Sequence, residues 1–273
     1  MPSRFRSPAR VCPTTWRSPR NYAILNDMPL FWDPALLAQG AYVPKFFPDT
    51  PTRFAVVPRR GETADIRWFE ADPTYVLHWI NAYEEGDEIV LDGFFQHTPS
   101  PRKHAGDSPM MSLYRYVDLA QLNSRPHRWR LNLVTGATKE ESLSDRVMEF
   151  GMINQQRAGQ RHRYSYNMTG APGWFLFDGL VKHDLTTGRE ERYGFGDGVF
   201  ASETPFAPRD IQGAREDDGY LLTFTTDVGR DRSECLIFDA SCILDGPIAR
   251  VRLPERISSG THSCWTPSTA LGS

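Results

Sequence analysis

The chain has 273 residues, of which 40% are hydrophobic and 24% are charged, the ordinary composition of a soluble globular protein. The formal net charge of −3 gives no reason to expect a nucleic-acid partner, and the short basic runs at Arg59 and Arg161 are best interpreted as solvated loops. No apolar run approaches the length of about 18 residues that a membrane span needs, and the basic N-terminus lacks the apolar stretch of a secretory signal.

A short helix is predicted early in the chain, over residues 33–39. Asp33 suits the N-cap position, Pro34 suits the first helical position, and Gly40 follows the expected end. Elsewhere, short apolar segments alternate with turns rich in glycine, proline and aspartate, and convincing helices are scarce. The pattern therefore predicts an all-β fold.

Residues 76–92 predict two strands joined by a turn at 85–87. His78 is predicted to lie in the middle of the first strand, where it shares an apolar face with Val76, Ile80 and Ala82. A buried imidazole needs a partner for both ring nitrogens. The ordinary interpretation is a core histidine hydrogen-bonded to a carbonyl group, and metal ligation is the alternative.

A weak internal repeat follows, in which an apolar segment ends at an Asn or Asp and runs into a tight turn. The three copies end at Asn132, Asp184 and Asp239, which are 52 and 55 residues apart. This spacing suits four-stranded propeller blades of roughly 40–50 residues, so the chain would hold about four and a half of them. Residues 54–61 resemble an earlier copy, displaced by a polar insertion at 98–107 that is predicted to be a surface loop.

The remaining titratable residues carry weaker signals. Glu149 lies between apolar neighbours, which predicts burial and hence a partner. The four cysteines form no Cys-x-x-Cys pair, so we expect reduced thiols in a cytoplasmic protein, with Cys235 and Cys242 as small core residues and Cys12 and Cys264 unassigned. Five other histidines are interpreted as structural or solvent-facing: His97, His104, His127, His162 and His183.

The run Asp-Pro-Thr-Tyr-Val-Leu-His-Trp-Ile-Asn-Ala-Tyr-Glu at 72–84 resembles the carotenoid cleavage oxygenases. These are non-haem iron(II) enzymes built on a seven-bladed β-propeller, and the family includes stilbene-cleaving and retinoid-isomerising members. The resemblance implies that His78 is one of four iron-binding histidines. Residues 253–265, in which Leu-Pro-Glu-Arg precedes Gly-Thr-His, resemble the closing motif of the family and imply that His262 is a second ligand.

Two glutamates lie in motifs that resemble the family between these histidines. Glu149 begins Glu-Phe-Gly-Met-Ile-Asn, where Gly151 replaces the usual proline, and Glu203 lies in Ser-Glu-Thr-Pro-Phe, which departs from the family at Thr204. The resemblance implies that these carboxylates hold metal-bound imidazoles by hydrogen bonds, which fixes the tautomer and orientation of each ring. It extends over residues 21–270.

The resemblance also implies a further histidine just before a strand like that at 22–27, and residues 11–20 contain none. We therefore expect a non-homologous or frame-shifted leader over residues 1–20. Residues 21–273 would form a partial propeller domain, an N-terminally truncated arc of about four to five blades from a seven-bladed family.

The expected activity is that of an iron(II) dioxygenase that cleaves a C=C bond of a carotenoid or apocarotenoid with O₂ to give carbonyl products. The cofactor carries this chemistry, so no side chain is assigned an acid–base role. A stilbenoid substrate is one alternative, and an inactive fragment that lacks two iron ligands is another. No hydrolase motif such as His-Glu-x-x-His or Gly-x-Ser-x-Gly is present.

The expected partners are a lipophilic conjugated small molecule and O₂. A peripheral membrane contact stays open, and the sequence does not reveal the oligomeric state. Aromatic side chains would either line an apolar tunnel for the substrate or belong to the core, among them Trp32, Phe46, Phe47 and Trp68.

Overall fold

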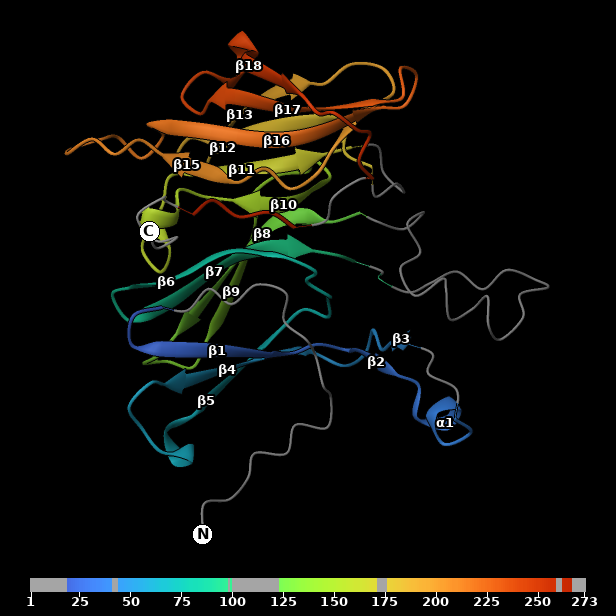
Figure 1. The fold of residues 1–273 in the computed structure, drawn as a ribbon. Helices are drawn as coiled ribbons and strands as arrows, with labels where there is room; N and C mark the ends of the chain where they lie inside the picture. Colours follow the sequence, from blue (N-terminus) through green and yellow to red (C-terminus); the bar gives the residue numbers. More distant parts are fainter. Residues whose placement is uncertain are drawn as a thin grey trace, which may run out of the picture.

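The computed structural model describes residues 19–40, 44–97, 99, 123–170, 176–258 and 262–266. Within these ranges nearly all regular structure is strand, so the expected all-β fold is confirmed. The sheets are antiparallel and lie one above another in chain order (Figure 1). No helix in the described part is long and apolar enough to cross a membrane. Residues 1–18 and almost all of the insertion at 98–107, with Cys12 and His104, lie outside the described residues.

The N-terminal part contains a three-stranded sheet in the order β1-β4-β5 and a small two-stranded sheet. Its strands are β1 (Tyr22–Asp27), β2 (Leu30–Trp32), β3 (Pro44–Phe46), β4 (Thr52–Pro58) and β5 (Arg67–Ala71). The predicted helix is confirmed as α1 (Pro34–Leu37), although it ends earlier than expected. Asp33 caps it, because its carboxylate accepts hydrogen bonds from Ala35 N and Leu36 N at 2.9 and 3.4 Å.

Three larger sheets follow. The first contains β6 (Trp79–Glu85), β7 (Glu88–Phe95), β8 (Arg125–Asn132) and β9 (Thr138–Ser142). The second contains β10 (Met148–Met152), β11 (Tyr164–Thr169), β12 (Gly179–Asp184) and β13 (Arg189–Gly194). The third is five-stranded and contains β14 (Val199–Ala201), β15 (Phe206–Pro208), β16 (Gly219–Asp227), β17 (Arg232–Asp239) and β18 (Pro247–Arg252). Short 3₁₀ turns lie at Thr63–Asp65, Gln155–Arg157 and Ile243–Asp245.

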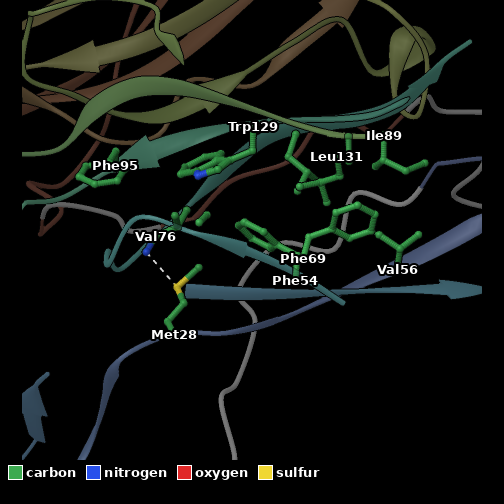
Figure 2. Packing of buried hydrophobic residues seen from close by; sticks show 12 residues of the cluster. Met28, Phe54, Val56, Phe69, Val76, Ile89, Phe95, Trp129 and Leu131 are labelled. Atoms are coloured by element: carbon green, nitrogen blue, oxygen red, sulfur yellow. Dashed lines mark hydrogen bonds between the residues drawn. The ribbon is translucent and has the colours of Figure 1, made fainter. Parts of the chain in front are cut away.

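A separate apolar core fills each space between successive sheets. The first joins β4 and β5 to β6–β8 around Phe54 and Trp129, and Figure 2 shows its side chains together with the hydrogen bond from Val76 N to Met28 Sδ. A second core joins the β6–β9 sheet to the β10–β13 sheet, and a third joins the latter to β14–β18. Leu180 and Val181 are neighbours on β12, yet they belong to different cores, because alternate side chains of a strand point to opposite faces.

The internal repeat corresponds to one turn that recurs between the last two strands of each large sheet. The Asn132 carboxamide accepts from Val134 N and Thr135 N at 2.9 and 2.8 Å. Asp184 and Asp239 make equivalent bonds to backbone N–H groups two residues ahead, at 3.0 and 2.9 Å. An Asn or Asp side chain that mimics a backbone turn in this way explains why those residue types recur at these positions.

The turn at Asp184 predicts a pH dependence of stability. Hydrogen bonds from Arg163 are the main reason that the pKa of Asp184 falls from 3.8 to about 2. Since the folded pKa lies below the unfolded value, the stabilisation is present above about pH 4 and is lost as the pH falls towards 2. Asp184→Asn keeps the turn acceptor but removes the charge. Its deficit in the free energy of unfolding, measured by urea titration, is expected to shrink between pH 5 and pH 3; a deficit that does not depend on pH would contradict this.

Candidate metal centre

The predicted site residues come together where the first strand of each large sheet departs from regular pairing. His78 immediately precedes β6, and the register of β6 on β7 shifts between Trp79 and Asn81. The register of β10 on β11 shifts just after Glu149. Glu203 lies in the break between β14 and β15, which both pair with β16. Irregular strands of this kind change the direction of their side chains, so polar side chains from three separate sheets lie close together.

His78 is buried and bound to a buried carboxylate. Its side chain is 5% exposed, and its Nδ1 lies 2.5 Å from Glu149 Oε2. Because an ionised carboxylate can only accept, Nδ1 carries the proton and donates. The expected burial is confirmed, but the expectation of a mid-strand position was wrong, since the ladder begins one residue later at Trp79. Glu149 Oε2 also accepts from Phe150 N at 3.1 Å.

His262 reaches the same place from the segment after β18. Its Nδ1 lies 3.3 Å from Glu203 Oε2, and Ser263 N donates to the same oxygen at 2.8 Å. Ser263 Oγ donates to the main-chain oxygen of Glu203 at 2.9 Å, which fastens this segment to the third sheet. The His262 side chain is 46% exposed whereas the Glu203 side chain is 7% exposed, so a half-exposed imidazole contacts a buried carboxylate.

The two imidazoles meet across a cavity of about 420 Å³, with ring centroids 5.3 Å apart. The structure therefore brings together all four residues that the motifs singled out. The rest of the lining is mainly apolar and comes from several elements: Trp79, Phe150, Met152, Pro205, Phe206 and Trp265. Gln155, Ser263 and Cys264 add polar or polarisable atoms.

The geometry of each histidine fits metal ligation. Nδ1 of each ring is held by a glutamate, which leaves Nε2 as the nitrogen for a metal, and carboxylate–histidine pairs of this kind are common around bound metals. Glu149 Oε1 is buried and has no hydrogen-bond partner among the described residues. A bound cation at His78 would compensate this uncovered negative charge.

The described residues supply only part of a ligand set. Within them, no group of three or more histidine, cysteine, aspartate or glutamate side chains is arranged to hold a metal ion. A metal ion held by His78 and His262 would therefore need further donors besides these two imidazoles.

Gly151 explains the departure from the family motif beside Glu149. A Cβ atom added at this position would lie 2.5 Å from Ile80 Cγ1 and 2.9 Å from Phe94 Cζ. Both neighbours belong to the core between the first two large sheets and are fully buried. Gly151 thus lies where an added side chain would meet buried atoms of β6 and β7.

Replacing Gly151 with alanine is therefore expected to push the two sheets apart. Overpacking of a tight core costs about 1–3 kcal/mol, which for a protein of this size lowers the melting temperature by several degrees. Gly229→Ala is the matched control, because a Cβ there meets only Asp227 Oδ1 at an ordinary 3.6 Å. Equal melting temperatures for the two variants, measured by calorimetry, would argue against tight packing at Gly151.

The other described histidines lie away from this cavity. His127 belongs to β8 rather than to a loop, and its Nε2 lies 3.2 Å from Glu140 Oε2. His162 was expected in a solvated basic run, but it is buried beside Asn81, while Arg161 and Arg163 on either side are exposed. His183 is buried in β12, and this burial lowers the pKa of its imidazole. His97 is exposed and packs on Phe95.

The aromatic residues proposed for a tunnel do not line this cavity. Trp32 lines a second, apolar cavity near α1, and Phe47 stacks on Phe31 with centroids 4.2 Å apart. Phe46 is core, and Trp68 lies exposed under the guanidinium of Arg53. The aromatic residues that do line the cavity, such as Trp79 and Phe206, are close in sequence to the predicted site residues. That closeness is the feature of the sequence that could have identified them.

The cysteines also differ from the expectation. Cys235 is half-buried and Cys242 is exposed, so neither is a core residue. Leu236, between them, takes the inward position on β17, which turns Cys235 towards the outer face. Cys264 is exposed and lines the cavity beside His262, and the three described cysteines are free thiols.

Known proteins resemble most of this chain. Residues 19–267 match the family described as retinal pigment epithelial membrane protein. A carotenoid cleavage oxygenase of Mycobacterium tuberculosis is 34% identical over 235 residues, covering 81% of this chain and 44% of that protein. A carotenoid 9,10(9′,10′)-cleavage dioxygenase of Crocus sativus is 31% identical over 280 residues, covering 97% and 50%.

Among solved structures, the lignostilbene dioxygenase of Pseudomonas brassicacearum superposes with a TM-score of 0.81 at 25% identity, covering 96% of this chain and 56% of that chain. The chain spans about half the length of the curated relatives it matches. The match of residues 19–267 and these identities establish that the chain belongs to the retinal pigment epithelial membrane protein family, which its carotenoid cleavage oxygenase relatives represent.

Proposed function

We propose that this chain contributes to a non-haem iron(II) dioxygenase that cleaves a C=C bond of an apolar conjugated substrate. The observation that carries the proposal is the convergence of His78 and His262, each held through Nδ1 by a buried glutamate, on one apolar cavity. Two relatives support this class of reaction, because the Mycobacterium tuberculosis and Crocus sativus proteins are named as carotenoid cleavage enzymes.

Iron(II), when bound, would supply the activation of O₂. His78 and His262 would hold the ion through Nε2, while Glu149 and Glu203 keep the two rings in the required tautomer and orientation. The apolar side chains of the cavity would bind the substrate, place its double bond beside the ion and exclude water. The overall reaction breaks one C=C and one O=O bond and forms two C=O bonds, so it balances without an external reductant.

A carotenoid or apocarotenoid is the proposed substrate. The aromatic part of the lining, formed by Trp79, Phe150 and Phe206, suits a planar polyene. A stilbenoid is the second candidate, favoured by the likeness to the lignostilbene dioxygenase fold. We further propose a cytoplasmic location and a peripheral membrane contact through which a lipophilic substrate is acquired.

The proposal is tested by loading the purified chain with iron(II) under anaerobic conditions and measuring iron per mole of folded protein. The loaded chain is then incubated in air with an apocarotenal or with a hydroxylated stilbene, and aldehyde products are identified by mass spectrometry. We expect aldehydes that carry one ¹⁸O atom each from ¹⁸O₂, and loss of turnover after chelation. Bound iron without turnover of either substrate would reject the activity for this chain.

The second candidate is an inactive fragment of such an enzyme. It is favoured by the ligand set, because only two imidazoles converge among the described residues. In that case the same experiment gives no bound iron, or iron that a weak chelator removes at once.

We also propose that the stacked sheets are blades of a seven-bladed propeller and that this chain forms an arc of about four to five of them. On the outer face of the third large sheet, Phe224 and Val251 are 39% and 50% exposed and flank Cys235 across three strands. An apolar sheet face is normally covered, and an adjoining blade would cover it. Small-angle X-ray scattering from the chain is expected to match an open arc rather than a closed ring.

A further inference from the structure

Phe150 packs against both candidate metal ligands. Its ring centroid is 4.5 Å from that of His78 and 5.7 Å from that of His262, and the two imidazole centroids are 5.3 Å apart. The three rings therefore touch one another in pairs. Phe150 is 3% exposed, and Phe177 packs against its other side with centroids 5.3 Å apart, so the ring has little freedom to move.

The backbone of Phe150 adopts a conformation that a bulky residue rarely takes. Its φ is 51°, in the left-handed region, and the only other non-glycine described residue with positive φ is Asp231, in the turn between β16 and β17. This conformation directs the Phe150 N–H to Glu149 Oε2 and the Phe150 ring to the imidazoles. Such strain persists where the surroundings impose it, and it often lies at functional sites.

His262 is the ligand that needs support most. Its side chain is 46% exposed, and its hydrogen bond to Glu203 is 3.3 Å long, compared with 2.5 Å between His78 and Glu149. The ring of Phe150 meets the His262 ring edge to face, at an interplanar angle of 86°. Edge-to-face contacts between aromatic rings are attractive and directional, so they can fix an orientation as well as fill space.

We propose that Phe150 is a positioning residue that sets the orientation of His262 relative to His78. This inference rests on the proposed function in one respect: the orientation of the two rings matters because it would present both Nε2 atoms to one metal ion. The ring acts as a rigid support that contacts both imidazoles, and the left-handed backbone holds that support beside Glu149. If Phe150 were only a core residue, its removal would change stability and leave the imidazoles where they are.

The first experiment measures the two rings without any metal. In protein labelled with ¹³C-histidine, we expect NOE cross-peaks between the ring protons of His78 and His262. Phe150→Leu and Phe150→Gly should both lose these cross-peaks. Glycine adopts the left-handed backbone without steric cost, so loss in Phe150→Gly assigns the effect to the ring rather than to the backbone.

Two further variants control for unfolding and for loss of volume. Phe177→Leu removes an aromatic ring of the same core that packs against Phe150, and it should keep the cross-peaks. Phe150→Tyr retains an aromatic ring at this position and should also keep the cross-peaks. Cross-peaks that persist in a folded Phe150→Gly protein, or that vanish equally in Phe177→Leu, overturn the proposal.

The second experiment measures Co²⁺ affinity by isothermal titration under the same conditions. Phe150→Leu and Phe150→Gly should bind about 10-fold more weakly than wild type, whereas Phe177→Leu and Phe150→Tyr should stay within about 2-fold, since groups that orient ligands typically change affinity by 10–100-fold. If the wild-type chain binds no Co²⁺, the proposed metal function fails, and the NOE experiment still decides the positioning role separately.

Discussion

Replacing His78 with alanine is expected to lower the affinity of the chain for iron(II) by on the order of 100-fold or more. Removing a metal ligand should weaken binding at least as much as removing a residue that only orients a ligand. The imidazole is one of only two that converge on the cavity among the described residues, and Glu149 already holds its Nδ1. His262→Ala should act in the same direction. The measurement is iron per mole of protein after anaerobic loading and dialysis, with near-ultraviolet circular dichroism to confirm folding.

His127→Ala is the matched control for this prediction. His127 is also paired with a glutamate, Glu140, at 3.2 Å, but it lies on β8 among Phe95 and Trp129, away from the cavity. Both substitutions delete an imidazole from a histidine–glutamate pair. A difference in iron content between the two variants would therefore reflect the location of the histidine and not the loss of such a pair. If His78→Ala folds and retains iron as well as His127→Ala does, His78 is not a ligand.

Much of the fold follows from local pattern. Apolar segments that alternate with Gly, Asn and Asp turns predict strands, and the recurrence at Asn132, Asp184 and Asp239 identifies the turn between the last two strands of three successive sheets. These features depend on a few adjacent residues, which is why sequence alone reveals them. The same locality explains the correct prediction of the Asp33 cap.

The parts that sequence reasoning missed depend on packing between sheets. His162 sits in a basic run, but the fold places it beside Asn81, and no local pattern reports that contact. Cys235 was expected inside because its neighbours are apolar, yet the strand period turns it outward. Gly151 looked like a mild departure from a motif, and only the positions of Ile80 and Phe94 show why a side chain does not fit there.

The site itself was identified by motif and not by geometry. His78, Glu149, Glu203 and His262 are far apart along the chain, so nothing in their spacing predicts contact. Their convergence arises because successive sheets stack and the register of the first strand shifts beside His78 and Glu149. The pairing of His78 with Glu149 and of His262 with Glu203 is a finding of the structure, since the motifs assigned no partners.

Glu149→Gln is expected to weaken metal binding by about 10–100-fold while changing stability much less. Glutamine fills the same volume, but it offers one acceptor and one double donor instead of two acceptors. If its oxygen faces His78 and Phe150, its NH₂ group takes the buried place of Oε1, an atom that has no hydrogen-bond partner among the described residues. If it flips, NH₂ faces the Nδ1–H of His78, and the ring escapes this clash by moving its proton to Nε2, the nitrogen that a metal needs.

The two arrangements are distinguished by ¹⁵N chemical shifts of His78 in the metal-free protein, which report the tautomer, together with Co²⁺ titration calorimetry. Glu140→Gln is the control, because Glu140 holds His127 in a similar pair outside the cavity. We expect the His78 tautomer to change or the ring to lose its fixed orientation only in Glu149→Gln. An unchanged tautomer together with an unchanged Co²⁺ affinity would show that the carboxylate does not tune His78, and the buried, unpaired Oε1 would then need another explanation.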